Sequence, residues 1–247
     1  MSRREFVSPE GLRLDGRRPD ELRKLQARMD LFSRADGSAY VEMGNTKVVA
    51  AVYGPREVRR ASMAKHDRAV VRAEFGMATF ATGERKKSSK GDKRSAEVSQ
   101  MLVATFEPVI LTELFPRSQI DIFVHVLQAD GGNVAAAINA ATLALIDAGI
   151  PLKDFVVACS AGHIDGANVL DLNYLEDSSG GGPELLLAML PTEATLSLVK
   201  INDRIPLDVY DALVSLAMKG AALIHEVLVA KVKEHAHQQA ASLGTIV

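Results

Sequence analysis

The chain has a single cysteine, Cys159, and no tryptophan among its 247 residues. With one cysteine it cannot form an internal disulfide, and a zinc site built from several cysteines is excluded. Aromatic residues make up only 5% of the sequence, so broad base-stacking platforms for single-stranded nucleic acid are not expected. Neither basic nor acidic residues are in large excess. The net charge is −2, so a polyanionic partner would have to be bound by a local basic patch.

Long apolar runs are missing as well. No stretch approaches the roughly 20 consecutive apolar residues of a membrane span, and the N-terminal sequence MSRREFVSPEGLRLDGRR lacks the apolar core of a signal peptide. We therefore expect an intracellular protein with no membrane partner. The length fits a single domain over residues 1–247, with residues 1–20 as an N-terminal extension and residues 237–247 as a flexible tail.

The order of the hydrophobic patterns predicts a mixed α/β fold, an α+β arrangement of helices stacked on sheets. Alternating residues over Ala39–Tyr53 indicate a hairpin that turns at Gly44-Asn45 and ends at Gly54-Pro55. Helices are expected at Ser95–Leu114, where Pro108 should either kink or break the helix, at Asn133–Ala148, and at Leu207–His235.

The stretch LQADGGNVAAAINAATLALIDAGIP, residues 127–151, is the most informative local pattern. A strand leads into Gly131 and Gly132, and a helix of small residues leaves the turn. This layout commonly presents free backbone N–H groups to an anion. A dinucleotide site would need a third glycine and an acidic residue about 20 positions further on. A plain buried turn and an anion site both remain open, and Asn133 and Val134 add no charge to either.

Charged residues are concentrated in one acidic loop and in two basic runs. The loop LEDSSGGGPE could bring Asp177 and Glu184 together as metal ligands or as an acid–base pair, or it could be a solvated loop. Residues 56–72 and 85–94 are rich in arginine and lysine. Such runs are commonly solvated faces, but two of them in a chain of slightly negative net charge could also bind a nucleic-acid backbone.

Several motifs in the same order resemble the RNase PH family. They are GLRLDGRR, ADGSAYVEMGNTKVVAAVYGP, FPRSQIDIFVHVLQADGG, INAATLALIDAGIP and VLDLNYLEDS, and the similarity runs from about Glu10 to His235. The resemblance implies an RNase PH-like fold, two β-α layers with mixed sheets packed against helices and a long C-terminal helix. It also implies a ring of six such subunits around an RNA channel. Active members of the family cleave RNA from its 3′ end with inorganic phosphate as the nucleophile.

The resemblance implies a phosphate site at the glycine turn. Arg94 matches one phosphate-binding arginine of the family, whereas Asn133 stands at the position of a hydroxyl residue and Val134 at that of a second arginine. An arginine–phosphate hydrogen bond is worth roughly 1.5–3 kcal/mol. We therefore expect a degenerate site, whose remnant consists of Arg94, Gly131, Gly132, Asn133 and Val134.

The resemblance also implies a pair of catalytic aspartates. Asp177 matches the first of them. The second falls at Pro183, and Glu184 could replace it only if the loop carries a one-residue shift. Together with the loss of charge at Val134, this predicts that the chain is not an enzyme. Asp177 and Glu184 would be vestigial, and no cofactor or metal is expected.

The resemblance thus predicts a non-catalytic core ring subunit of a eukaryotic-type RNA exosome. Its partners would be other RNase PH-like ring subunits, cap subunits, an associated exoribonuclease and single-stranded RNA. Its work would be 3′–5′ RNA degradation and processing, including rRNA processing, in the nucleus, nucleolus and cytoplasm. RNA-binding residues are expected at the channel neck and deeper in the channel: Arg59, Arg60 and Lys65, then Lys93 and Arg94.

Two other functions remain open. The first is an active phosphate-dependent 3′–5′ exoribonuclease, which would use Arg94 and Asp177 with Mg²⁺, inorganic phosphate and groups from a partner subunit. The second is a small-molecule-binding α/β protein with no role in RNA. Phosphate-dependent release of nucleoside diphosphates would identify the first, and salt-dependent RNA binding would exclude the second.

Overall fold

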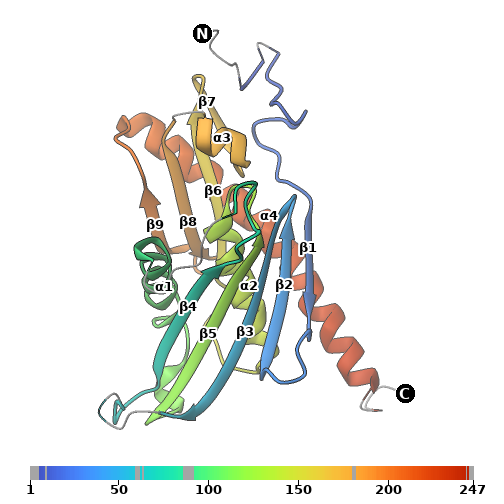
Figure 1. The fold of residues 1–247 in the computed structure, drawn as a ribbon, viewed down its shortest axis with the longest axis vertical. Helices are drawn as coiled ribbons and strands as arrows, with labels where there is room; N and C mark the ends of the chain where they lie inside the picture. The colour runs from blue at the N-terminus through green and yellow to red at the C-terminus, as the bar shows by residue number, and fades with distance from the viewer. Residues whose placement is uncertain are drawn as a thin grey trace.

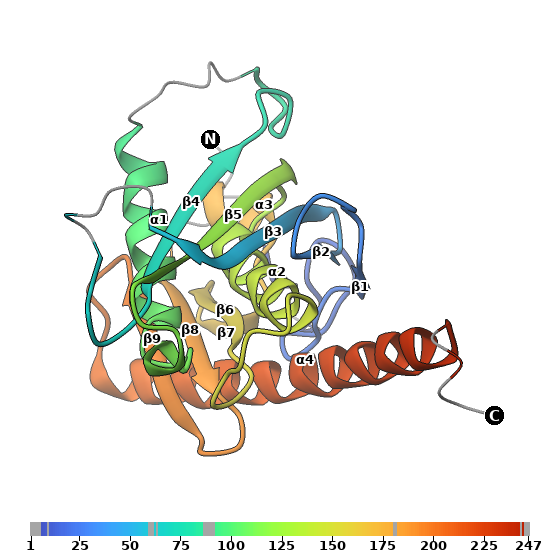
Figure 2. The ribbon, with the colours of Figure 1, turned by 90° about the horizontal axis from the view of Figure 1, so that it is seen from below.

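The computed structural model describes residues 6–8, 10–58, 62, 64–85, 92–179, 182–242 and 244. Two β-sheets enclose helices α1 (Lys93–Phe106) and α2 (Asn133–Asp147), and the long helix α4 (Leu207–Ser242) covers the far face of the second sheet (Figure 1 and Figure 2). The order of the layers is therefore sheet, helices, sheet, helix. This confirms the mixed α/β architecture with a long C-terminal helix that the sequence predicts.

The first sheet has five strands in the order β1-β2-β3-β5-β4. Their bounds are Leu25–Met29 for β1, Gly37–Met43 for β2, Thr46–Glu57 for β3, Ser118–Gln128 for β5 and Val70–Met77 for β4. All neighbours are antiparallel except β4 and β5, which are parallel. Because side chains alternate along a strand, β3 and β5 bury one apolar face: Val48, Ala50, Val52, Ile120, Ile122, Val124 and Val126.

Helix α2 lies at the centre of the core. It packs against β2, β3 and β5 on one side and against β6 and β8 on the other. Small residues on both partners allow this close packing. A Cβ added to Gly37 of β2 would lie only 2.2 Å from the backbone nitrogen of Ala148, directly after the end of α2. A side chain at Gly37 would therefore push the helix away from the sheet.

The second sheet has four antiparallel strands in the order β7-β6-β8-β9. Their bounds are Ala167–Leu170 for β7, Val157–Ile164 for β6, Glu184–Leu190 for β8 and Thr195–Ile201 for β9. The two central strands are buried on both faces, because α2 packs against β6 and β8 on one side and α4 packs against them on the other. This explains why their sequences read as continuous apolar runs instead of alternating ones.

Helix α4 is long and apolar enough, by length and composition alone, to cross a membrane. It serves here as a core helix, because one of its faces packs against β6, β7 and β8. The buried residues of that face are Leu213, Ala217, Gly220, Ala221, Ile224 and Leu228. The helix extends to Ser242, beyond the expected end at His235 and into the segment expected as a tail.

Two elements end at places other than those expected. Helix α1 stops at Phe106 and does not reach Leu114, so of the two expected effects of Pro108 the structure shows the break, because proline has no N–H for the helix ladder and its ring disfavours a further turn. A short 3₁₀ turn follows at Thr112–Leu114. Strand β3 does not end at Gly54-Pro55. It continues to Glu57, and its pairing with β5 shifts register where the proline stands.

Two further elements lie in segments that the sequence patterns left without regular structure. The first is β1, in the charged stretch before the hairpin. The second is α3 (Tyr174–Ser179), in the acidic loop. The start of α3 is held by a reciprocal capping box, because Asn173 Oδ1 accepts the backbone N–H of Glu176 (3.0 Å) and Glu176 Oε2 accepts that of Asn173 (2.9 Å).

Candidate active site

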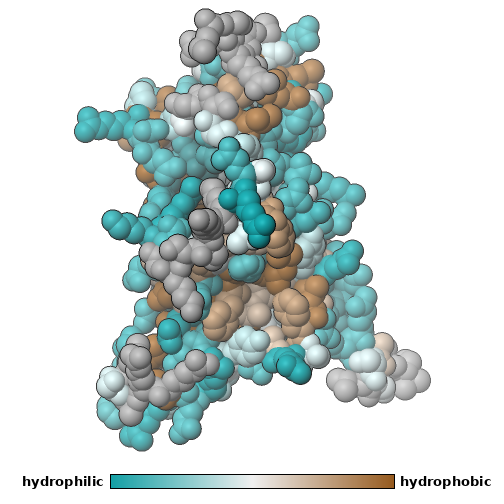
Figure 3. Space-filling model, viewed as in Figure 1, coloured by the Kyte–Doolittle hydropathy of each residue, from teal (hydrophilic) through white to brown (hydrophobic). Residues whose placement is uncertain are grey.

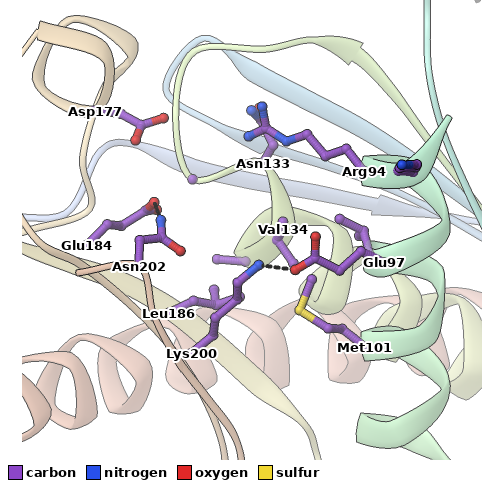
Figure 4. Close-up of a pocket in the computed structure, with 14 residues that line it drawn as sticks. Arg94, Glu97, Met101, Asn133, Val134, Asp177, Glu184, Leu186, Lys200 and Asn202 are labelled. Carbon is purple, nitrogen blue, oxygen red and sulfur yellow. Dashed lines mark hydrogen bonds and ion pairs between the residues drawn. The ribbon is translucent and has the colours of Figure 1, made fainter. Parts of the chain in front are cut away.

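A cavity of about 520 Å³ opens between the two sheets, at the start of α1 and α2. The first turn of α1, the first turn of α2, α3 and the neighbouring ends of β8 and β9 form its walls (Figure 4). Its polar lining consists of Lys93, Arg94, Glu97, Asn133, Asp177, Glu184, Lys200 and Asn202. Val98, Met101, Val134 and Leu186 provide apolar surface between them. Cations and carboxylates thus converge on one concave space.

The glycine turn brings the start of α2 to this cavity. Gly131 and Gly132 have φ angles of +77° and +60°, a conformation that other residues rarely adopt. A Cβ on Gly131 would also lie 2.4 Å from the carbonyl oxygen of Leu172, so no side chain fits there. The turn places Asn133 and Val134 in the first turn of α2, where backbone N–H groups have no intrahelical acceptor. This end of the helix favours anions.

Three cations line the cavity. Lys93 and Arg94 come from the first turn of α1, and Lys200 comes from β9 on the opposite wall. The ammonium group of Lys200 lies 2.5 Å from a carboxylate oxygen of Glu97, so this ion pair bridges β9 and α1 across the cavity (Figure 4). The hydrogen bond from Lys200, followed by its charge, holds the pKa of Glu97 below its ordinary value. Positive charge is therefore present on two walls of the site.

A pair of carboxylates faces these cations. Asp177 stands on α3, and Glu184 is the first residue of β8. Burial, followed by the nearby charge of Asp177, raises the pKa of Glu184 from 4.5 to about 7, although Arg94, Lys200 and a hydrogen bond from Asn202 act in the opposite direction. Asn202 Nδ2 donates that bond to Glu184 Oε2 at 3.0 Å. A carboxyl group with a pKa near 7 can both hold and release a proton at neutral pH.

The same pair is compatible with Mg²⁺. Within the part of the chain that the structure describes, no group of three or more histidine, cysteine, aspartate and glutamate residues could hold a metal ion. Mg²⁺, however, is commonly bound by one or two carboxylates, with substrate phosphates and water as its other ligands. Asp177 and Glu184 line one cavity together with cations that could hold such phosphates. The donor set therefore fits Mg²⁺ bound together with a phosphate substrate.

The structure brings most of the predicted site residues together. Arg94, Gly132, Asn133, Val134 and Asp177 all line the cavity. Lys93 lines it as well, beside Arg94. The second carboxylate is Glu184 and not a residue at the position of Pro183, so the arrangement corresponds to the loop with a one-residue shift.

Of the three residues predicted for the channel neck, the structure describes only Lys65. Lys65 lies outside this cavity, on an exposed loop where its ammonium group pairs with Glu107 at 3.0 Å. Arg59 and Arg60 lie outside the described residues. The role of these three residues in RNA binding stays a prediction.

Three polar cavity residues, Glu97, Lys200 and Asn202, were not identified from the sequence. Lys200 and Asn202 come from the last strand of the second sheet and its end, far along the chain from the glycine turn. The pairing of β8 with β9 places Lys200 opposite Leu186, two residues after Glu184. Had the two apolar runs been paired as a hairpin, this register would have put Lys200 and Asn202 beside the acidic residue.

Comparison with known proteins assigns the chain to a family. Residues 21–151 match the model described as 3′ exoribonuclease family, domain 1, and residues 154–220 match domain 2 of that family. The chain is 50% identical over 245 residues to the mouse protein named exosome complex component RRP41, covering 99% of this chain and 100% of the relative. It is 47% identical over 221 residues to exosome complex component Rrp41 of Methanopyrus kandleri, covering 90% of this chain and 92% of the relative.

A solved structure shows the same architecture. The crystal structure of Rrp46 from rice matches with a TM-score of 0.80 at 26% sequence identity, and the match covers 90% of this chain and 100% of that one. The RNase PH-like fold implied by the sequence motifs is therefore confirmed.

The prediction that the chain is not an enzyme is wrong. It depended on Asn133 and Val134, but the cavity retains Arg94 and a pair of carboxylates, and Lys200 adds a cation that the prediction did not count. Both halves of the chain match 3′ exoribonuclease models, and the similarity extends to an Rrp41 of Methanopyrus at 47% identity. None of these similarities marks the chain as a degenerate copy. The chain belongs to the 3′ exoribonuclease family of RNase PH type.

Proposed function

We propose that the protein is a ring subunit of an RNA exosome and that its cavity removes nucleotides from the 3′ end of RNA by phosphorolysis. Relatives named as exosome components align with the chain over almost its whole length, which supports the ring assignment. The main support for the proposed activity is the set of residues that line the cavity. It combines cations on two walls with a carboxyl pair, of which Glu184 has a pKa of about 7.

Inorganic phosphate, in this proposal, binds at the start of α2. The backbone N–H groups of its first turn and the guanidinium of Arg94 are the first donors. Val134 contributes no charge. Lys200, on the opposite wall, supplies a positive charge in its place. Because the ammonium of Lys200 pairs with Glu97, phosphate must compete with Glu97 for it. A charge-assisted hydrogen bond of this type is worth roughly 1.5–3 kcal/mol.

The chemistry follows from the positions of the anion site and the carboxyl pair. A phosphate oxygen forms a bond to the phosphorus of the last phosphodiester, and the bond from that phosphorus to the 3′ oxygen of the preceding nucleotide breaks. The products are a nucleoside diphosphate and an RNA shorter by one nucleotide. The departing 3′ oxygen needs a proton, which protonated Glu184 donates as a general acid. Glu184 is left as a carboxylate and regains a proton from solvent.

Phosphorolysis brings two anionic phosphate groups together, and this repulsion must be reduced. Mg²⁺ supplies positive charge for the two groups when it is bound. Asp177 is the residue that would hold it, since this carboxylate is exposed to the cavity on α3. Arg94 and Lys200 add to the positive charge from the other walls.

The open face of the first sheet supports a place in a ring. Val49 and Ala51 of β3 and Phe123 of β5 alternate with buried residues and therefore point outward, and Phe123 is 38% exposed. Figure 3 shows apolar side chains gathered over the middle of this face. We propose that an RNase PH-like neighbour covers it. Cap subunits, an attached exoribonuclease and single-stranded RNA complete the proposed partners, in the nucleus, nucleolus and cytoplasm.

Reconstitution tests the proposed activity. The chain is assembled with its RNase PH-like neighbours and incubated with single-stranded RNA, Mg²⁺ and inorganic phosphate. We expect nucleoside diphosphates whose formation requires phosphate and is lost in the Asp177→Asn variant. Glu193→Gln, on an exposed turn away from the cavity, is the matched control and should retain activity. Absence of nucleoside diphosphates, or their undiminished release by Asp177→Asn, would refute phosphorolysis at this site.

A further inference from the structure

The segment before β1 packs beside the cavity walls. Residues 10–24 carry Arg13, Arg17 and Arg23, whose side chains are only 0%, 13% and 6% exposed. The family models begin at residue 21, so Arg13 lies before the matched range. Burying an unpaired charge costs several kcal/mol, so each buried arginine requires compensating partners. The partners of Arg13 show which part of the fold this segment holds.

Arg13 joins the end of β7 to the acidic helix. Its Nε donates to Glu176 Oε1 at 2.8 Å, and its Nη2 donates to Glu176 Oε2. The remaining donors reach the backbone, with Nη1 bonded to the carbonyl of Leu170 and Nη2 to that of Asp171 at 3.0 Å. A bidentate arginine–carboxylate pair has a fixed geometry. Arg13 therefore restricts both the position and the rotation of α3 relative to the second sheet.

The orientation of α3 decides where Asp177 points. Glu176, the residue clamped by Arg13, also completes the capping box with Asn173, and Asp177 is the next residue along the helix. The backbone N–H of Asp177 bonds to the carbonyl of Asn173 at 3.0 Å. Since the Asp177 side chain is exposed on the cavity wall, its direction follows from the helix that carries it.

The residues that lead into α3 also contact the glycine turn, which forms the anion-binding part of the cavity. The close approach of Gly131 to Leu172, described above, sets the glycine turn against the residues that lead into α3. Arg23 connects the two parts directly, with Nη2 bonded to Asp171 Oδ1 at 2.7 Å and Nη1 bonded to the carbonyl of Asp130. A displacement of α3 would therefore change the separation between Asp177 and the anion site.

We propose that Arg13 is a positioning residue for Asp177, and that through Glu176 it sets the distance of this carboxylate from the phosphate-binding turn. The inference rests on the proposed function and deepens it, because a residue outside the cavity would determine where one carboxylate of the pair lies. A misplacement of about 1 Å can cost on the order of 100-fold in rate. Loss of the clamp is therefore expected to affect turnover far more than phosphate binding.

The test uses the double variant Arg13→Met/Glu176→Gln in the assembled ring. Arg13→Met alone would leave a buried carboxylate unpaired, which costs about 3–5 kcal/mol and can prevent folding. The second change removes that charge, and glutamine can still complete the capping box. The control, Arg56→Met/Asp121→Asn, removes a different arginine–carboxylate pair, between β3 and β5 and outside the cavity.

Two measurements are made where the variants are fully folded. We expect kcat to fall about 10- to 100-fold with KM for phosphate within about twofold of the unsubstituted protein, and the control to leave kcat unchanged. Amide hydrogen exchange in residues 174–179 should rise about tenfold or more, with α2 unaffected. A purely structural pair would lower stability without this split between kcat and KM. A kcat within about threefold of the unsubstituted value, or unchanged exchange in α3, would overturn the inference.

The exchange measurement also separates this inference from the proposed activity. If the unsubstituted ring shows no phosphorolysis, the proposed function fails, and exchange in α3 alone decides whether Arg13 holds the helix. Faster exchange in the double variant then supports the clamp, and unchanged exchange refutes it.

Discussion

Replacing Glu184 by glutamine gives the most quantitative test of the site. Burial, and then the charge of Asp177, raise the pKa of Glu184 from 4.5 to about 7. At higher pH the fold must therefore keep an ionised and poorly solvated carboxylate in the cavity wall. Each pKa unit corresponds to about 1.36 kcal/mol, so full ionisation of Glu184 lowers the free energy of unfolding by roughly 3 kcal/mol.

The sign of the pH dependence follows from the two protonation states. A pKa that is higher in the folded than in the unfolded state means that the folded chain binds more protons between pH 4.5 and about 7. The contribution of Glu184 to the free energy of unfolding must then fall as pH rises through this window. Because glutamine cannot ionise, the stability of Glu184→Gln relative to the unsubstituted protein should rise by roughly 2–3 kcal/mol from pH 4.5 to pH 8.

Urea denaturation at closely spaced pH values measures this difference. Glu193→Gln, the same substitution on an exposed turn, serves as the control and should follow the unsubstituted protein. In the assembled ring, kcat of the unsubstituted protein should also decline above pH 7 as the general acid ionises, and Glu184→Gln should be inactive. Parallel stability curves for Glu184→Gln and the unsubstituted protein between pH 4.5 and 8 would show that Glu184 is an ordinary solvated carboxylate, and the acid assignment would fall with it.

Lys200→Met should raise KM for phosphate at least about tenfold, as expected for one lost charge-assisted hydrogen bond, whereas Lys200→Arg should retain most of the affinity; equal KM values in steady-state assays would exclude Lys200 from the phosphate site. Phe123→Asp should weaken ring assembly at least about tenfold in sedimentation experiments and lower the stability of the isolated chain by no more than roughly 2 kcal/mol, because the side chain is partly exposed and loses an edge contact with Tyr53; undisturbed assembly would remove this face from the interface. Changing Arg59, Arg60 and Lys65 together to glutamate should weaken RNA binding about equally for different sequences and make the salt dependence shallower, by roughly 0.7 in log–log slope for each lost phosphate contact; an unchanged slope would mean that these residues form a solvated surface.

The parts of the fold that the sequence predicts correctly are those with a local signal. Strands β2 and β3 alternate over consecutive residues and meet in a glycine turn, so their pairing of Tyr40 with Val49 needs no information from the rest of the chain. The same holds for the double glycine before α2, whose backbone conformation other residues rarely adopt. Each of these patterns is set by residues that follow one another in the sequence.

The missed parts depend on residues that are distant in sequence. Arg13 reads as one more cation in a turn-rich segment, and only the fold shows that its partner is Glu176. Lys200 reads as the polar residue of a partly exposed strand, yet it faces the cavity opposite α1. The error about catalysis has the same origin, since the charge missing at Val134 was sought in adjacent residues, whereas the cavity draws its cations from α1 and β9.

The contact between Gly131 and the carbonyl of Leu172 has a consequence for which substitutions the site can accept. It joins backbone to backbone, so it requires that no side chain stand at Gly131 but makes no demand on the side chains at the start of α3. Those side chains are held by other contacts, namely the capping box of Asn173 and Glu176 and the pairing of Arg13 with Glu176. The backbone contact and these side-chain contacts together keep the two halves of the site in place. We expect mutational scanning to find residue 131 intolerant of any replacement, and Gly182 likewise, because a Cβ on Gly182 would lie 2.0 Å from the carbonyl oxygen of His163.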